Sequence, residues 1–476
     1  MTITSAPIIV LFRNDLRVSD NGALAAASAT GKPVVPLFIF DEEQQDARPA
    51  GAASRWWLHH SLSALGNSLG LLGVQLALRQ GATKEIVAET ARTTGADAVF
   101  WNRRYTPVSI TADTALKSEL RAEGFQAESF DGFLLHEPSR LMTRSGDFYK
   151  VFTPFYNRLA EDEFRDPFDA PTSIVAWQGE LRSSKLDEFK LLPKSPDWSS
   201  GLAERWQPGE QGAAESLATF LEDRLGNYTD SRNVPGVQGT SGLSPHLAHG
   251  EITPFQIMAA LRRRRGEGVQ TFRKELAWRE FSYHLLFNRP KLHIENFRPE
   301  FDAFEWRSAP AALRAWQSGR TGYPIVDAGM RELWQTGWMH NRVRMIAASF
   351  LIKDLLIDWR AGEEWFWDTL VDADSANNPA SWQWVAGSGA DAAPYFRIFN
   401  PILQGEKFDA DGSYVRRYVP ELAKLPDRYV HRPWEAPASV LKECGITIGE
   451  NYPSPIVNHS DARERALAAY RDTRSN

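Results

Sequence analysis

The sequence is poor in cysteine and has no long apolar run. Cys444 is the only cysteine among 476 residues, which excludes an internal disulfide and a zinc or iron–sulfur site built from four cysteines. The apolar run at residues 8–12 is too short for the core of a signal peptide, and no stretch reaches the roughly 18 apolar residues of a membrane helix. We therefore expect a soluble, cytoplasmic protein without a membrane partner.

The chain also lacks the positive charge that is typical of nucleic-acid-binding proteins, since its net charge is −6. That charge is unevenly distributed. Residues 262–344 contain 16 lysines and arginines against 9 aspartates and glutamates, a local charge of +7, which leaves −13 for the rest of the chain. Because a phosphate responds to the local field, the net charge does not exclude nucleic acid. Tryptophan, by contrast, is abundant, and ten of the 17 lie between Trp278 and Trp384.

A dinucleotide fingerprint is missing as well. The first 130 residues alternate apolar runs with helical stretches, and strands are predicted at 8–12, 34–40, 74–78, 98–101 and 127–130. Strands separated by helices predict a parallel, doubly wound α/β sheet. The first strand leads into Arg13-Asn-Asp-Leu-Arg17, without the glycines of a G-x-G-x-x-G turn. This sheet is therefore not expected to hold a dinucleotide in the usual way.

The remainder of the chain changes character twice. Residues 131–200 are rich in proline, aspartate, serine and lysine, which predicts a long connection with one or two helices or, alternatively, a solvated linker. Helical periodicity dominates after residue 200. Ser244-Pro245 and Thr253-Pro254 each place a hydroxyl before a proline, a pattern typical of a capped helix start. We predict an α/β domain at 1–130, an interdomain linker at 131–200 and an all-α domain at 201–476.

Two helical segments carry residues suited to a ligand. Thr240-Ser-Gly-Leu-Ser-Pro245 combines three hydroxyls and a glycine with a helix start, which suits a phosphate, although a simply capped helix is the alternative. Glu275, Trp278, Arg279 and Ser282 have the spacing of one helix face. A core face would not carry glutamate and arginine, so this face predicts a polar cavity or a ligand. A structural salt-bridge face is the alternative.

No metal site is predicted. The acidic segment 372–378 resembles a calcium loop only at first sight, because Asn377 stands where position six requires glycine and Gln383 where position twelve requires glutamate. His246 and His249 have a spacing that could share a metal, but no third ligand is apparent in the sequence. The carboxylates are therefore expected to pair with arginine, to cap a helix or to bind ligand hydroxyls.

Together these segments resemble the cryptochrome/photolyase family over nearly the whole chain. The motifs that carry the resemblance are Thr240-Ser-Gly-Leu-Ser-Pro245, Trp278-Arg-Glu-Phe281, Thr321-Gly-Tyr-Pro-Ile-Val-Asp327, Gly337-Trp-Met-His-Asn-Arg342, residues 372–384 and 391–401, and Gly405-Glu-Lys-Phe-Asp409. The resemblance implies an N-terminal Rossmann-like antenna domain and a C-terminal helical domain that binds FAD. Within the family the chain is most similar to bacterial photolyases that act on cyclobutane pyrimidine dimers.

The resemblance assigns a large set of residues to FAD: Tyr228, Thr240, Ser241, Gly242, Leu243, Ser244, Phe272, Arg279, Asn341, Arg344, Asp372, Asp374 and Asn378. It implies a buried salt bridge between Arg344 and Asp372, whose loss on one side would be costly. It also places the amide of Asn378 beside the flavin N5, where plant cryptochromes typically have aspartate. An amide there favours the fully reduced, anionic flavin that can donate an electron.

A second set is assigned to DNA and its lesion: Arg232, Glu275, Trp278, Ser282, Asn341, Arg342, Met345, Trp384 and Gln404. Asn341 stands where (6-4) photolyases carry histidine, which favours the cyclobutane dimer. The implied reaction is light-driven repair by electron transfer from excited, reduced FAD to a flipped-out dimer. Trp278 and Trp384 would offer stacking surfaces, and Glu275, if protonated or next to a donor, would hydrogen-bond the base carbonyls. Glu275 and Asn378 are thus expected to act in catalysis.

Trp382, Trp359 and Trp306 match the family's chain of tryptophans, which carries electrons from the surface to oxidised flavin; core packing is the alternative. For the antenna we predict 5,10-methenyltetrahydrofolate, with Asp41, Glu42, Glu43 and Asn102 as candidate contacts. The expected partner is DNA that contains UV-induced pyrimidine dimers, bound by a monomer. The main alternative function is a cryptochrome-type blue-light receptor without repair activity.

Overall fold

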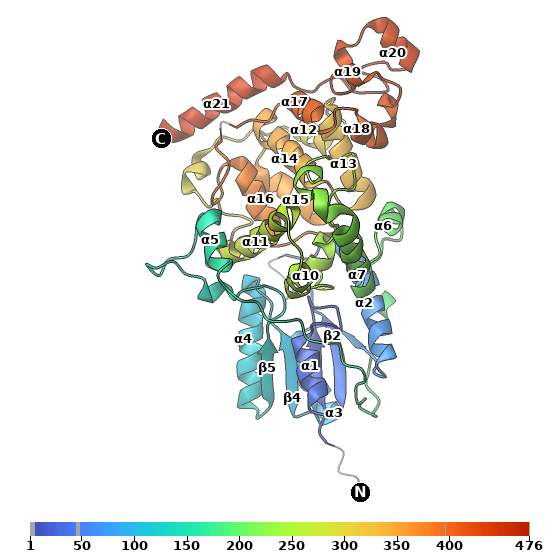
Figure 1. Ribbon diagram of the computed structural model, residues 1–476, viewed down its shortest axis with the longest axis vertical. Coiled ribbons are helices and arrows are strands. Elements are labelled where there is room, and N and C mark those ends of the chain that lie inside the picture. The colour runs from blue at the N-terminus through green and yellow to red at the C-terminus, as the bar shows by residue number, and fades with distance from the viewer. Residues whose placement is uncertain (1–4, 44–47, 396, 476) are drawn as a thin grey trace. The chain divides into compact units, whose positions relative to one another are not determined.

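The N-terminal region forms a parallel sheet. The computed structural model describes residues 5–43, 48–395 and 397–475. Its five strands are β1 (Ile8–Phe12), β2 (Val34–Phe40), β3 (Ala77–Gln80), β4 (Ala98–Asn102) and β5 (Gln126–Phe130), in the order β3-β2-β1-β4-β5 (Figure 1). All four strand pairs are parallel. The predicted doubly wound α/β domain is therefore confirmed.

Helices cover both faces of this sheet. They are α1 (Gly22–Ala29), α2 (Ala52–Leu71), α3 (Thr83–Thr94) and α4 (Pro107–Ala122). Successive side chains of a strand point to opposite faces. Val10 of β1 accordingly packs in one cluster with Leu24 of α1, whereas Ile9 packs in a second cluster with Val87 of α3. Burial on both faces explains why the strands read as unbroken apolar runs.

The edge strand β3 differs from its prediction. The sequence favoured residues 74–78, but the strand begins at Ala77 and ends at Gln80. Its register is set by pairing with β2, in which Leu37 lies opposite Ala77 and Phe40 opposite Gln80. Val74 is buried without belonging to the strand. The apolar side chain of Val74 therefore indicates burial in the core and not membership of the hydrogen-bonded strand.

The connection at 131–200 has little regular structure but is anchored to the core. It contains the short turns η1 (Pro138–Arg140) and η2 (Leu186–Phe189) and one helix, α5 (Phe152–Leu159). Ile174 and Phe189 are buried in the same apolar cluster as β1. Phe155 of α5 is completely buried. These contacts tie the connection to the neighbouring elements.

The rest of the chain is helical, and the chain as a whole forms two compact units. The first comprises residues 1–223, 241–290 and 371–375, and the second residues 224–240, 291–370 and 376–476. The helices of the first unit after the connection are α6 (Ser200–Arg205), α7 (Glu210–Thr219), α9 (Ser244–Ala248), α10 (Pro254–Leu261) and α11 (Glu267–Asn288). The predicted helical region is confirmed.

The second unit contains the remaining helices: α8 (Tyr228–Ser231), α12 (Pro310–Gln317), α13 (Pro324–Thr336), α14 (Asn341–Ser349), α15 (Trp359–Thr369), α16 (Asn377–Ala386), α17 (Pro401–Phe408), α18 (Ser413–Tyr418), α19 (Asp427–Val430), α20 (Ala438–Cys444) and α21 (His459–Ser475). Short helical turns lie before α8 at Phe220–Arg224 and Leu225–Asn227. Others lie between the later helices at Pro299–Ala303, Phe350–Asp354, Pro420–Leu422 and Pro433–Glu435. Within the described ranges, no helix is long and apolar enough to cross a membrane. Phe396, inside the motif at 391–401, lies outside the described residues.

One of the two predicted caps is wrong. Helix α10 starts as expected, because Thr253 and Gln256 form a reciprocal capping box in front of Pro254. Helix α9 instead begins at Ser244 itself, after Leu243, and the hydroxyl of Ser244 does not cap it. That hydroxyl donates to Oδ2 of Asp372 at 2.7 Å. The local pattern thus placed the helix start one residue too late, and the hydroxyl of Ser244 meets a carboxylate from a distant segment.

Candidate functional site

Helix α11 carries the predicted polar face. Glu275, Trp278, Arg279 and Ser282 all lie on this single helix. Arg279 and Ser282 are buried, and Glu275 and Trp278 are half-buried. The indole of Trp278 lies flat against the ring of Phe152, with 3.6 Å between ring centroids and 5° between planes. The hydroxyl of Ser282 donates to the carbonyl of Trp278 at 3.0 Å, so this serine is engaged within its own helix.

Arg279 and Glu280 hold the chain that follows strand β5. Arg279 donates from Nη1 to the carbonyl of Phe133 at 2.9 Å, and its guanidinium lies 4.4 Å from the centre of the Phe133 ring. Glu280 accepts from the backbone N–H of Leu135 at 2.9 Å. Burial raises the pKa of Glu280 to about 7, against the opposing effect of Arg279 and the backbone donors. Sequence reasoning missed Glu280, although a glutamate next to the predicted Arg279 was visible.

The segment at 371–375 is fixed against α9 and α11. Asp372 accepts from the Ser244 hydroxyl, and Asp374 accepts from the Tyr283 hydroxyl of α11 at 2.7 Å. Both aspartates are about nine-tenths buried. Gly242, which precedes α9, has a φ of +70°, a backbone conformation that favours glycine. The structure thus brings Ser244, Asp372 and Asp374 together, as one hydroxyl and two carboxylates beside α11.

In the second unit, arginines gather around the start of α14. His340 caps this helix by accepting from the N–H of Arg342 at 3.2 Å. Burial, together with the positive charges of Arg342, Arg344 and Arg232, lowers the pKa of His340 to about 3. Arg342 donates to Oδ1 of Asn233 at 2.6 Å. The histidine is therefore neutral at physiological pH, and the region has the electrostatics of an anion site.

Other predicted residues of the second unit lie close to this region. Arg232 lies over the buried ring of Tyr228, 5.6 Å from its centre. Asn341 is exposed and Met345, one turn later on α14, is half-buried. Helix α14 packs against α16, which carries the half-buried Trp384.

The remaining cofactor and DNA candidates are placed as follows. Thr240 is half-buried, and its carbonyl accepts from Arg224 at 3.2 Å. Ser241 accepts from the N–H of the buried Leu243 at 3.3 Å. Phe272 is buried on α11 and packs against Phe220 at 4.5 Å. Arg344 donates to the carbonyl of Met339 at 2.7 Å, and Gln404 is half-buried on α17. The pairing of Arg344 with Asp372 stays a prediction.

Asn378 is held in a defined orientation by Glu363. Its Nδ2 donates to Oε1 of Glu363 at 2.8 Å and to the carbonyl of the same residue at 3.0 Å. Both amide hydrogens are thereby directed toward α15, so Oδ1 faces the other way. Glu363 is almost completely buried. The sequence carried no signal that singled out Glu363 as this partner.

The three tryptophans of the predicted chain differ in exposure. Trp382 and Trp359 are buried, and Trp306 is half-buried. Trp359 donates from Nε1 to Oδ1 of Asn296 at 3.0 Å, and Trp382 lies 4.9 Å from Phe366 and 6.2 Å from Trp316 between ring centres. Of the three, only Trp306 has appreciable access to solvent. The electron-transfer role stays a prediction.

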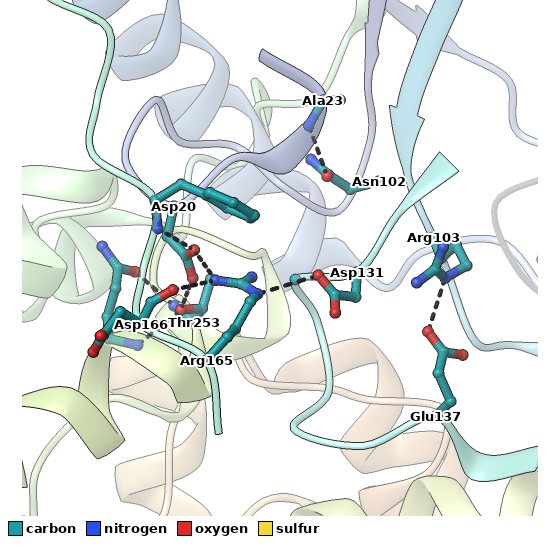
Figure 2. Close-up of polar contacts among 12 residues, drawn as sticks. Asp20, Ala23, Asn102, Arg103, Asp131, Glu137, Arg165, Asp166 and Thr253 are labelled. Atoms are coloured by element: carbon teal, nitrogen blue, oxygen red, sulfur yellow. Dashed lines mark hydrogen bonds and ion pairs between the residues drawn. The ribbon is translucent and has the colours of Figure 1, made fainter. Parts of the chain in front are cut away.

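The carboxyl edge of the sheet is polar as well (Figure 2). Ligands of open α/β sheets bind where the strand order reverses, which here is between β1 and β4. A shallow depression lies there, lined by Asn14, Asp15, Arg17, Asn102, Arg103, Arg104, Gly132 and Phe133. Asn102 donates to Asp15 at 2.6 Å and to Asn21 at 2.8 Å, and accepts from the N–H of Ala23 at 3.2 Å.

A second group at this edge centres on Asp20. Its carboxylate accepts from Arg165 at 2.6 Å, from the Thr253 hydroxyl at 2.5 Å and from the N–H of Phe168 at 3.0 Å (Figure 2). Arg103 pairs with Glu137 at 2.8 Å. These side chains therefore bind one another, and the network has the character of a structural joint between α10 and the sheet.

The acidic residues predicted for an antenna also have protein partners. Asp41 accepts from the N–H and the hydroxyl of Thr83 at 2.8 and 2.7 Å, at the start of α3. Glu42 pairs with Arg55 at 2.6 Å. Glu43 is exposed and donates its N–H to Asp41 at 3.3 Å. Their assignment to an antenna stays a prediction.

A buried cluster around Glu251 was not expected from the sequence. Its carboxylate accepts from Trp57 at 2.9 Å and from Ser61 at 2.6 Å, and it contacts Nδ1 of His246. His249, the other histidine considered for a metal, stacks on Trp57. Among the described residues, no group of three histidine, cysteine or acidic side chains could hold a metal ion.

Comparisons with known proteins cover the whole chain. A family model described as the FAD binding domain of DNA photolyase matches residues 272–472, and one described as DNA photolyase matches residues 8–172. A deoxyribodipyrimidine photo-lyase of Agrobacterium fabrum is 55% identical over 99% of this chain and 98% of its own length. Cryptochrome-1 of Arabidopsis thaliana is 38% identical over 96% of this chain and 69% of its own length. The crystal structure of a bacterial class III photolyase from Agrobacterium tumefaciens, 54% identical, has a TM-score of 0.97 and covers 100% of both chains.

Proposed function

The chain belongs to the DNA photolyase and cryptochrome family, and on that basis we propose that it uses light to split cyclobutane pyrimidine dimers in DNA. The observation that carries the proposal is the 55% identity, over 99% of the chain, to a deoxyribodipyrimidine photo-lyase. The family and the FAD-binding domain expected from the motifs are thereby confirmed. We assign the antenna domain to residues 1–130 and the FAD-binding domain to residues 201–476, with 131–200 between them.

The side chains present are of the kinds that FAD requires. In the first unit, the hydroxyls of Ser241 and Ser244 suit the phosphates and ribose of FAD, and Arg279, Asp372 and Asp374 suit its other hydrogen-bonding groups. In the second unit, Arg344 is proposed for FAD as well. Oδ1 of Asn378, turned away from Glu363, can accept a hydrogen bond from the N5–H of a reduced flavin. When bound, reduced and excited by light, FAD supplies one electron that opens the two carbon–carbon bonds of the cyclobutane ring and then returns, so that no net reductant is consumed.

Trp278 and Glu275 are proposed to meet the lesion in the first unit. A dimer must leave the base stack before it can react, at a cost of a few kcal/mol that is smaller for a damaged base. Stacking on an aromatic side chain contributes roughly 1–3 kcal/mol per base, which is enough to offset that cost. Glu275 is proposed, in its protonated form, to donate a hydrogen bond to a base carbonyl and to stabilise the charge that develops there. In the second unit we assign Asn341, Met345, Trp384 and Gln404 to the lesion strand.

The arginines around α14 support binding to the DNA backbone. Arg342, Arg344 and Arg232 lie near one another around His340, whose pKa burial and these three positive charges lower to about 3. Phosphates are bound by such clusters of positive charge with an affinity that falls as salt rises. We assign Arg232 and Arg342 to phosphates.

Two further parts complete the proposal. We assign the path that brings electrons to oxidised flavin to Trp382, Trp359 and Trp306.

For the antenna we propose 5,10-methenyltetrahydrofolate. Absorbance and mass spectra of the purified holoprotein test the antenna, and a chromophore of another class would contradict it.

The repair proposal is tested with chemically reduced holoprotein and an oligonucleotide that contains a single thymine dimer. We expect intact dimers to disappear under blue light and to persist in the dark. A matched oligonucleotide with a (6-4) photoproduct is expected to stay unrepaired. Absence of light-dependent dimer loss, with FAD bound and reduced, would contradict the enzyme and favour a blue-light receptor.

A further inference from the structure

The indole of Trp278 has an aromatic ring behind it that comes from the connection between the domains. Phe152, the first residue of α5, is buried and lies parallel to Trp278 with 3.6 Å between ring centroids. The ring of Tyr156, one turn later, lies 5.8 Å from that of Phe152 with 20° between the planes. A ring from a segment rich in proline and polar residues therefore covers one face of the proposed stacking wall.

The geometry of this pair is imposed by the surrounding packing. Isolated aromatic pairs prefer offset or edge-to-face arrangements over a face-to-face stack. The rings of Phe152 and Trp278 are instead nearly parallel and stacked face to face. Helix α5 is held to α11 by Phe155, which is fully buried between Phe281 and His284, 5.2 Å from each ring. The anchor at Phe155 thus determines where the Phe152 ring lies.

His284 holds the chain that enters α5. The N–H of Tyr149 donates to Nε2 of His284 at 3.0 Å. Burial lowers the pKa of this histidine to about 4, so at neutral pH Nε2 carries a lone pair and serves as the acceptor. The start of α5 is therefore fixed both by a backbone hydrogen bond and by apolar packing.

We propose that Phe152 is a positioning residue for lesion binding, which fixes the plane of Trp278 so that the opposite face of the indole receives the flipped-out dimer. This inference rests on the proposed function. A tryptophan that is free to rotate loses rotamer freedom when a base stacks on it, which weakens binding. Phe152 removes that loss in advance, because the indole is already confined to one plane in the free protein.

The test measures dark binding and light-driven repair of the holoprotein with Phe152→Ala. We expect the Kd for dimer-containing oligonucleotide to rise about three- to tenfold, the range that follows from freeing one aromatic side chain. Affinity for undamaged DNA, bound FAD and the repair rate at saturating DNA should stay unchanged, since Phe152 touches neither phosphate nor reacting atoms. Phe152→Tyr, which keeps the ring, should restore the wild-type Kd.

Two variants guard the interpretation. Phe152→Leu keeps most of the buried apolar volume and should fold even where alanine does not, with the same direction of change. Tyr156→Ala removes a ring of the same helix that is one layer farther from Trp278, and should change the Kd less. The role of Phe152 would be overturned if Phe152→Ala and Phe152→Leu both kept the wild-type preference for dimer-containing over undamaged DNA. It would also be overturned if these variants lost affinity for damaged and undamaged DNA equally. A wild type that neither discriminates dimers nor repairs them would instead overturn the proposed function itself.

Discussion

The carboxyl edge of the sheet and the start of helix α14 both contain charged side chains, but the charges are arranged differently. At the sheet edge, Asp20 is surrounded by a guanidinium, a hydroxyl and a backbone N–H. Around α14, Arg342, Arg344 and Arg232 lie close enough to His340 to lower its pKa, which burial lowers further, while the buried Glu332 accepts the N–H of His340 at 3.1 Å. Opposite charges that bind one another stabilise a fold, whereas like charges held close together favour a ligand of opposite sign. The comparison contrasts a network of mutually paired groups with a cluster of neighbouring arginines.

The antenna residues predicted at the sheet edge already have hydrogen-bond partners within the protein. Asn102 makes hydrogen bonds to Asp15, Asn21 and Ala23, and Asp41 holds Thr83 at the start of α3. A chromophore that used either side chain would compete with these contacts. We therefore expect the sheet edge to contribute to stability and the helical residues to contribute to light chemistry.

The largest expected effect is on the helical side. Trp382→Phe should abolish light-driven reduction of oxidised FAD, because phenylalanine is much harder to oxidise than tryptophan. Repair by chemically reduced protein should be unchanged. The measurement is FAD absorbance under blue light with an external reductant, and Trp177→Phe, a tryptophan of the sheet-side unit, is the control. Unchanged photoreduction in Trp382→Phe would contradict electron transfer through this tryptophan.

The next effect belongs to the sheet edge. Asp20→Asn should lower the free energy of unfolding by about 1.5–3 kcal/mol, because it removes the charge of a buried carboxylate that accepts hydrogen bonds from Arg165, Thr253 and Phe168. Asparagine suits the φ of +47° at this position, so the loss reports on the charge. Urea unfolding gives the value, and Asp97→Asn, which breaks the exposed pair with Lys32, should cost at most about 1 kcal/mol. Loss of repair per folded FAD-bound molecule in Asp20→Asn would contradict a purely structural role.

The helical region also contains a structural carboxyl, that of Glu280. Its pKa is raised by burial from 4.5 to about 7, so the folded state favours the protonated form. Its contribution to stability is therefore complete below pH 4.5 and is lost as the pH rises through 7, by up to about 3 kcal/mol. Glu280→Gln, which does not ionise, should reduce this pH dependence of the unfolding free energy. Identical pH profiles would contradict the raised pKa.

The smallest effect concerns the DNA backbone. Arg342→Ala should weaken binding of damaged and undamaged DNA about equally, and should reduce the slope of log K against log salt by about one. Arg432, which pairs with Glu406 and Glu435, provides the matched control, and its alanine variant should leave the slope unchanged. A selective loss for dimer-containing DNA would place Arg342 at the lesion and not at a phosphate.

Patterns of short range were predictable from the sequence. The alternation of apolar runs and helices is sufficient for the parallel sheet, and the i, i+3, i+4, i+7 spacing placed Glu275 and Ser282 on one helix. Thr253 caps its helix as expected because all partners lie within three residues. Family motifs added the FAD assignment, which spacing alone could not supply.

Contacts between distant segments were not predictable. The hydroxyl of Ser244 binds Asp372, Glu363 orients Asn378 and Phe152 stacks on Trp278. In each case the local pattern is ambiguous, since a serine before proline, a helical glutamate and a phenylalanine among polar residues each have common alternative roles. Only the tertiary fold determines which partner is within reach.

The most direct test of light-driven repair follows FAD and dimer together after single light pulses. Reduced holoprotein is mixed with excess dimer-containing oligonucleotide without external reductant, and bound-FAD absorbance and intact dimer are measured after each pulse. We predict that dimers decrease with each pulse while the absorbance returns to that of reduced FAD, because the electron comes back. FAD that ends oxidised with dimers intact, or dimers lost equally in the dark, would contradict it.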